Sequence, residues 1–205
     1  LNSNSYTESG WDANGAPGIT RNSTHFIISH RERVGNSSRG KYITVHSCSR
    51  NKNIKDASNW NELWSVSDNT AGVSSFERAV IRYWEGNYYL YFTADDGGWD
   101  LYYVESSTVG GLQTQLSSKS NWNSMFSLAD GEKDPWVGRV NGNYVALIQI
   151  TWWGSQNEIG IYTDDNPGFN SPTNQLRTTR SGGNGRYVSY DESSGKYIAA
   201  FDNRS

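Results

Sequence analysis

The amino-acid sequence predicts an all-β fold, a propeller built of four-stranded antiparallel blades. The first observation is a repeated peptide, because "SNWNELWSV" occupies residues 58–66 and "SNWNSMFSL" occupies residues 120–128, 62 positions later. A period of this size is about what one propeller blade needs. The second is composition, since Trp, Tyr and Phe make up 14% of the chain and aromatic residues favour strands. The third is length, because 205 residues suit one domain better than two.

Strand-like segments recur in a constant order and define the blades. A short inner strand opens each blade, and its first residues lie at intervals of 61, 57 and 51, at Ala16, Glu77, Asp134 and Gly185. A middle strand rich in Tyr, Ile, Val and Phe follows, in residues 24–33, 86–95, 142–151 and 195–204. Third strands are expected in residues 41–49, 99–107 and 157–165. The Ser-Asn-Trp-Asn segments are then outer strands, where Trp60 and Trp122 are expected to cover the gap between adjacent blades.

This order predicts a single domain with three complete blades, at about residues 17–66, 78–128 and 135–180, and part of another at 185–205. Residues 1–15 are either an edge strand of the incomplete blade or the remnant of a missing blade, and a start at Leu1 suggests a trimmed chain. Closure with four blades and closure with five both stay open. Because an unclosed propeller exposes strand edges, self-association or a partner chain covering an open edge is a further expectation.

Composition excludes several classes of partner. The net charge is -3 and only 19% of residues are charged, so we expect no basic surface for nucleic acid. No apolar run approaches the length of a membrane span. Cys48 is the only cysteine, which excludes an internal disulfide. The many Trp and Tyr residues suit either stacking on sugar rings or filling β cores and interfaces. Carbohydrate is the expected partner, and a secreted or extracellular location is the expectation that goes with it.

Two carboxylates are the candidate catalytic residues. In a propeller the starts of the inner strands converge on one end of the central channel, so Glu77 and Asp134 are expected to meet there. Two carboxylates facing one another across a channel can divide the work of glycoside hydrolysis, one as acid and the other as base or stabiliser. The alternative is structural, with Glu77 paired to the adjacent Arg78 and Asp134 to the adjacent Lys133.

Short motifs over nearly the whole chain resemble a known family. "GAPGI" with "THFIISHRE", "KDPWVGRVNGNYVALI" and "GNGRYVSYDESSGKYIAAFDNR" look like inner and middle strands of the five-bladed glycosidases of glycoside hydrolase family 43 and its relatives in families 32, 62 and 130. The resemblance implies that Ala16-Pro17 opens blade two, Glu77 blade three, Asp134 blade four and Gly185 blade five.

The resemblance also implies roles, and the sequence departs from them. Glu77 would modulate the acid and Asp134 would be the acid, but the family has Asp and Glu at these places respectively, so the carboxylate types are exchanged. The general base of the family belongs to a first blade without a counterpart in this chain. Asn184 or Arg186 replaces the histidine of the fifth blade. The two hypotheses are therefore a glycoside hydrolase acting on a polysaccharide or oligosaccharide, and a non-catalytic secreted carbohydrate-binding, matrix or structural propeller.

Other residues are candidates for substrate binding or for structural roles. Arg21, Arg82 and Arg139 recur five residues beyond the aligned strand starts. They would form a basic ring for an acidic sugar or a sulfate, or else serve as salt-bridge partners between blades. Trp136 and His30 are further candidate substrate contacts.

No cofactor is expected to be required, and no metal site is predicted from the histidines. His25, His30 and His46 lie on neighbouring predicted strands without an evident carboxylate or Cys spacing for zinc. They are expected to be ordinary strand histidines. Three aspartates, Asp95, Asp96 and Asp100, lie close together in "TADDGGWD" (93–100). This segment is first a strand-connecting turn, but it leaves room for a structural calcium ion.

Overall fold

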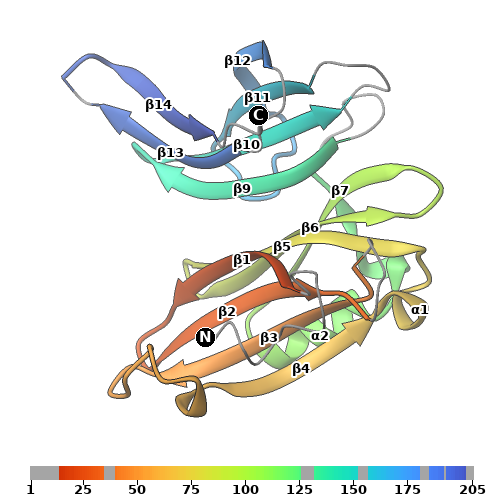
Figure 1. Cartoon of the computed structure of the whole chain (residues 1–205). Coiled ribbons are helices and arrows are strands. Elements are labelled where there is room, and N and C mark those ends of the chain that lie inside the picture. The colour runs from red at the N-terminus through yellow and green to blue at the C-terminus, as the bar shows by residue number, and fades with distance from the viewer. Residues whose placement is uncertain are drawn as a thin grey trace.

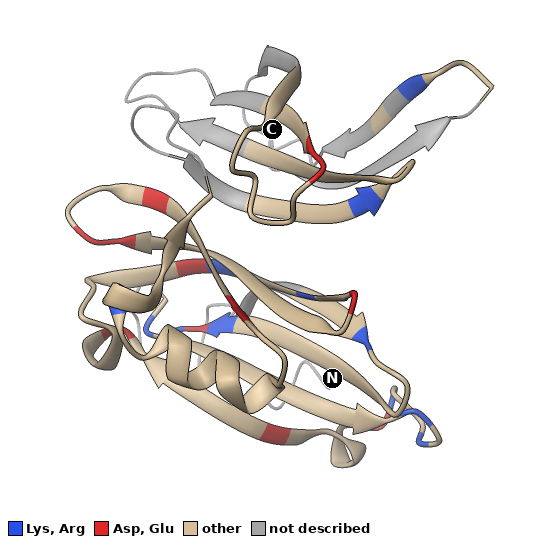
Figure 2. Cartoon of the chain, turned by 180° about the vertical axis from the view of Figure 1, so that it is seen from behind, with Lys and Arg blue, Asp and Glu red and all other residues tan. Residues whose placement is uncertain are grey.

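Three four-stranded antiparallel blades and a two-stranded hairpin make up the chain, in a computed structural model that describes residues 14–34, 40–125, 132–151, 157–180, 185–191 and 193–201 (Figure 1). The predicted all-β propeller with three complete blades and part of another is confirmed. Among the described residues, Lys and Arg are interspersed with Asp and Glu along the ribbons (Figure 2).

Each complete blade is a meander of four strands, in chain order from the inner strand outward. The first consists of β1 (Asn14–Arg21), β2 (His25–Glu32), β3 (Tyr42–Ser49) and β4 (Asn61–Ser67). The second consists of β5 (Ser75–Trp84), β6 (Asn87–Asp95), β7 (Trp99–Ser106) and β8 (Asn123–Ser124). The third consists of β9 (Glu132–Val140), β10 (Asn143–Thr151), β11 (Asn157–Asp164) and β12 (Thr173–Arg180). The hairpin consists of β13 (Gly185–Asp191) and β14 (Lys196–Phe201).

The inner strands β1, β5, β9 and β13 are neighbours in space, although about 50 to 60 residues separate them in the chain. The strands β1 and β5 run parallel and meet at Pro17 and Ala79, so the first two blades form one continuous eight-stranded sheet. Strand β5 also contacts β9, and β9 contacts β13. The inner strands therefore hold the blades together.

Side chains of the first blade satisfy backbone groups along the inner edge of β5. The Ser29 hydroxyl donates to the Ala79 carbonyl at 2.8 Å and accepts from the Ile81 amide at 3.0 Å. The Thr20 hydroxyl accepts from the Tyr83 amide at 3.0 Å. A buried backbone group without a partner costs about 1–3 kcal/mol, so these contacts stabilise the junction of the two blades.

The hydrophobic core lies between the blades, because alternate residues of a strand face opposite neighbours. On β6, Leu90 and Phe92 pack with the first blade, whereas Tyr89 and Tyr91 pack with the third. Leu90, Tyr91 and Phe92 are all fully buried. Strand β6 is thus apolar on both faces, which explains why its sequence is a nearly continuous apolar run.

Two short helices, α1 (Asp68–Ala71) and α2 (Val109–Leu116), were not expected from the sequence. Helix α2 connects β7 to β8 and buries Leu112 and Leu116 in the core between the first two blades. The indole of Trp64 on β4 donates to the carbonyl of Val109 at 2.9 Å, which attaches the helix to the first blade. None of the helices in the described ranges is long and apolar enough to cross a membrane.

The Ser-Asn-Trp repeat has the same local structure in both blades. Trp60 and Trp122 each follow a 3-10 turn, η2 (Ala57–Asn59) and η3 (Lys119–Asn121) respectively, and both adopt extended backbone. Each indole N–H donates to the carbonyl six residues earlier, at 2.9 Å to Ile54 and at 3.0 Å to Leu116. Both tryptophans are partly buried, and Trp122 packs on the core between the first two blades. The repeat is therefore a structural device for entering the outer strand.

Candidate functional site

Every inner strand is irregular at, or directly beside, the residue that the sequence alignment places at its start. The pairing of β1 with β2 shifts between Gly15 and Gly18, and that of β5 with β6 shifts between Glu77 and Ala79. The pairing of β9 with β10 shifts between Leu147 and Gln149, opposite Trp136 and Lys133, and that of β13 with β14 shifts between Gly185 and Tyr187.

These shifts place four residues at equivalent positions, Ala16, Glu77, Asp134 and Gly185. Bulges re-aim side chains and are common beside active sites. The four inner strands therefore lose regular pairing at the same place along their length, and this is the place where the sequence alignment puts the four residues.

Glu77 lies at the junction of the first two blades. Its carboxylate forms an ion pair with the guanidinium of Arg31 on β2, and the exposed fractions of the two side chains are 19% and 13%. The structural alternative from the sequence named the adjacent Arg78 as its partner, whereas the observed partner comes from the neighbouring blade.

Asp134 lies near the start of β9, in the register position that matches Glu77. Its side chain is outside the described part of the structure, as is that of Ala16. The separation of the two carboxyl groups, which would distinguish inverting from retaining chemistry, therefore stays a prediction.

The guanidinium of Arg82 connects three inner strands. It donates from Nε to the Val137 carbonyl on β9 at 2.6 Å, and from one terminal nitrogen to the carbonyls of Ile19 on β1 and Ile81 on β5, both at 2.9 Å. Burial lowers the pKa of Arg82 to about 10, which leaves it charged at neutral pH. Its Nε and one terminal nitrogen are committed to backbone carbonyls, an arrangement suited to a bond between blades.

Arg139 and Arg21 lie at the corresponding ends of their strands. Arg139 of the third blade forms an ion pair with Glu85 of the second at 2.9 Å, and its guanidinium lies 5.2 Å from the centre of the Tyr144 ring. Arg21 is exposed. Five residues of extended strand span about 16 Å, so the structure separates the three arginines from the bulged ends that carry Glu77 and Asp134.

Trp136 lies two residues beyond Asp134, at the point where the pairing of β9 with β10 becomes regular again. It is partly buried and packs against Val145, Leu147 and Ile161, while the Arg82 guanidinium lies 6.0 Å from the centre of its ring. The position is near Asp134 along the strand, which keeps Trp136 a candidate for contact with a sugar.

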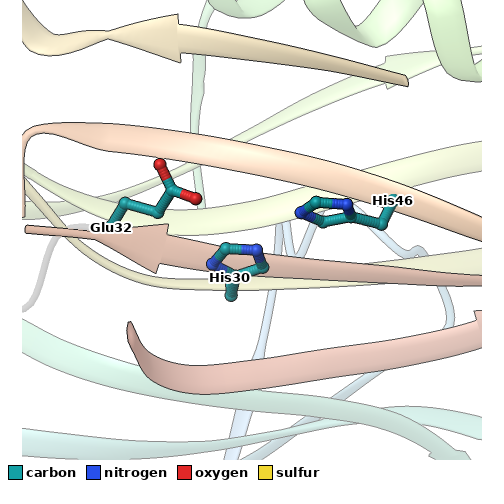
Figure 3. A group of neighbouring side chains, drawn as sticks. All are labelled: His30, Glu32 and His46. Carbon is teal, nitrogen blue, oxygen red and sulfur yellow. The ribbon is translucent and has the colours of Figure 1, made fainter. Parts of the chain in front are cut away.

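His30 belongs to a cluster with Glu32 and His46 (Figure 3). Its ring stacks on that of His46, with centroids 5.1 Å apart and planes 11° apart, and both histidines are buried, with exposed fractions of 5% and 6%. Nitrogen and oxygen atoms of the three side chains all lie within 4.8 Å of one another. The sequence analysis missed Glu32, although it lies two residues from His30 and therefore on the same face of the strand.

The aspartates of residues 93–100 make structural contacts. Asp96 accepts a hydrogen bond from the Tyr102 hydroxyl at 2.7 Å and forms an ion pair with Lys119. Asp100 accepts a longer bond from the same hydroxyl at 3.5 Å. The segment connects β6 to β7 as expected, and a calcium ion there stays a prediction.

Comparisons with known proteins identify the fold. No protein-family profile matches this sequence, and neither does any curated protein. Solved structures do match. An α-L-arabinofuranosidase from Lactobacillus brevis superposes with a TM-score of 0.63 at 12% sequence identity, covering 92% of this chain and 65% of that one. A thermostable family-43 glycoside hydrolase gives a TM-score of 0.63 at 10% identity, with coverages of 94% and 64%.

A third match is an α-L-arabinanase from Penicillium chrysogenum, solved with arabinobiose, with a TM-score of 0.59 at 10% identity and coverages of 95% and 60%. The fold is that of the β-propeller glycosidases. The chain spans about 65% of the length of the solved structures that it matches first. The predicted resemblance to family 43 propellers is thus confirmed in the fold.

Proposed function

We propose that this protein is a carbohydrate-active glycoside hydrolase of the propeller type, acting on a pentose-containing polysaccharide or oligosaccharide. The observation that carries the proposal is the register equivalence of Glu77 and Asp134 at the irregular points of neighbouring inner strands. The substrate class is supported by the arabinofuranosidase and arabinanase among the structures with the same fold.

The ion pair with Arg31 suggests how the two carboxylates divide the work. A carboxylate held charged by a guanidinium suits a stabilising role and not that of a proton donor. We therefore assign Glu77 to stabilise positive charge that develops on the sugar and to favour the protonated form of Asp134 by like-charge repulsion. Asp134 is assigned as the general acid, which protonates the oxygen of the leaving group.

The experiment measures hydrolysis of arabinan, xylan, galactan and fructan oligomers by the wild-type chain, Glu77→Gln, Asp134→Asn and the control Glu105→Gln. Glu105 is an exposed carboxylate on β7, so its loss changes net charge by the same amount as either test substitution. General acid catalysis contributes about 10²–10⁴-fold, and Asp134→Asn is expected to lower kcat by a factor in this range. Glu105→Gln is expected to leave kcat unchanged.

Glu77→Gln also breaks the ion pair with Arg31, so its fold is checked by circular dichroism before its kinetics are compared. Turnover that survives both Glu77→Gln and Asp134→Asn would refute the assigned site. Oligosaccharide binding without turnover in the wild-type chain would favour the alternative, a non-catalytic carbohydrate-binding propeller. Neither binding nor turnover with any sugar of the panel would refute the proposed substrate class.

A further inference from the structure

The cluster of His30, Glu32 and His46 is formed by two adjacent strands of the first blade. His30 and Glu32 are two residues apart on β2, so both side chains project from the same face. On β3, His46 lies opposite Ile28 in the antiparallel register, which makes it the diagonal neighbour of His30 on that face. The side chains point toward one another (Figure 3).

This face of the blade is distinct from the candidate catalytic position. The alternate residues of the same strands, among them Ile27, Ile43 and Val45, face the core shared with the second blade. His30, Glu32 and His46 therefore project from the opposite face of the first blade. A site there would be separate from Glu77, which lies at the junction with the second blade.

Burial opposes the charged form of all three side chains. Burial lowers the pKa of His30, and burial and the neighbouring imidazole lower that of His46, which favours the neutral imidazole that coordinates a metal. Burial raises the pKa of Glu32, a cost that a bound cation would relieve.

Surrounding groups suit a coordination sphere. Thr44, which pairs with His30 across β2 and β3, hydrogen-bonds the Glu32 carboxylate and would orient it as outer partners orient metal ligands. Glu62 pairs with His46 across β3 and β4 and acts electrostatically on all three members of the cluster. The two carboxylates together balance the charge of one dication.

We propose that His30, Glu32 and His46 bind one divalent transition-metal ion of the zinc class. Two imidazole nitrogens and one carboxylate oxygen are a ligand set that suits Zn²⁺, whereas Ca²⁺ and Mg²⁺ prefer oxygen ligands alone. Zinc holds such ligands at about 2.0–2.2 Å, which places them about 3.3–3.6 Å apart around a tetrahedral ion. In the structure the three ligand atoms lie within 4.8 Å of one another. Side-chain rotations that shorten the longest of these separations by about 1 Å would give the distances that zinc requires.

The experiment titrates the metal-free wild-type chain with zinc chloride alone, in isothermal titration calorimetry and in thermal unfolding. The test variants are Glu32→Gln and His46→Gln. The matched control is His25→Gln, because His25 is a partly exposed histidine on the same strand that bonds with Thr24. Co²⁺ serves as a second probe, since its visible spectrum reports nitrogen and oxygen ligands directly.

We expect one equivalent of Zn²⁺ to bind, and Tm to rise by about 5–10 °C at a free zinc concentration of about 100 times Kd. Removal of a residue that only orients a metal ligand lowers affinity by roughly 10–100-fold. Each test variant removes a ligand itself, so its affinity for zinc is expected to fall by more than this, while His25→Gln keeps wild-type affinity.

Glu32→Gln conserves size at a half-buried position, so it reports on binding even if His46→Gln fails to fold. Absence of stoichiometric binding to the wild-type chain would overturn the proposal, as would binding unchanged in Glu32→Gln or weakened equally by His25→Gln. These readouts do not depend on glycosidase activity, so they decide the metal site separately from the proposed function.

Discussion

Replacing Arg82 by Met is expected to destabilise the junction of three blades. The substitution keeps a long side chain but removes the donors that bind the carbonyls of Ile19, Ile81 and Val137. A hydrogen bond to a charged group contributes about 1.5–3 kcal/mol, less for the exposed bond to Ile19, and release of the guanidinium to solvent offsets part of the sum. We expect the free energy of unfolding to fall by about 3 kcal/mol, which for a chain of this length lowers Tm by about 6–12 °C.

Urea and thermal unfolding measure this effect, with two further variants for comparison. Arg82→Lys keeps the charge and can restore one of the bonds, so an intermediate loss is expected. Arg139→Met removes an exposed ion pair with Glu85, and such pairs contribute about 0–1 kcal/mol. A loss in Arg82→Met no larger than that in Arg139→Met would refute the role of Arg82 as a bond between blades. Normal stability with weakened sugar binding would instead identify it as a substrate contact.

Two more predictions concern stability. Burial opposes ionisation of Asp96, but hydrogen bonds from Lys119 and from the Tyr102 hydroxyl outweigh burial and lower the pKa of Asp96 below 3.8. The ionised carboxylate therefore stabilises the fold above pH 3.8, and this stability is lost as pH falls through the lower pKa of the folded state. Asp96→Asn should therefore lower the free energy of unfolding by about 1–2 kcal/mol at pH 7, and Tm should then depend less steeply on pH in the acid range. An acid-range dependence of Tm equal to that of the wild type would contradict this. Gly18→Ala places a methyl group 2.6 Å from the Val80 Cα across β1 and β5 and should cost about 1–3 kcal/mol. Gly110→Ala in α2 meets nothing within 4 Å and should stabilise by up to about 1 kcal/mol, so equal Tm values for the two alanine variants would disprove the close contact.

Local sequence patterns were sufficient to predict the strands and their order. Runs such as "GNYYLYFTAD" identify a strand locally, because they are rich in Tyr and Phe and follow a turn residue. The Ser-Asn-Trp repeat identified equivalent turns for a local reason as well, since the bond from each indole spans only six residues. Helix α2 was missed because Gly110 and Gly111 give it a weak intrinsic preference, and its burial against Trp64 and the core supplies what propensity does not.

The sequence by itself determined which residues occupy equivalent positions, and the tertiary structure decided what each of them contacts. Alignment along the chain placed Glu77 at the start of an inner strand, but its partner, Arg31, lies 46 residues away on another blade. His30, Glu32 and His46 became a cluster only when the β2–β3 register was known. The physical reason is that the alternation of residues along a strand decides which face each side chain occupies, and this depends on neighbouring residues alone. Ion pairs and metal-ligand sets depend instead on strand register and on the packing of the blades, which long-range contacts determine.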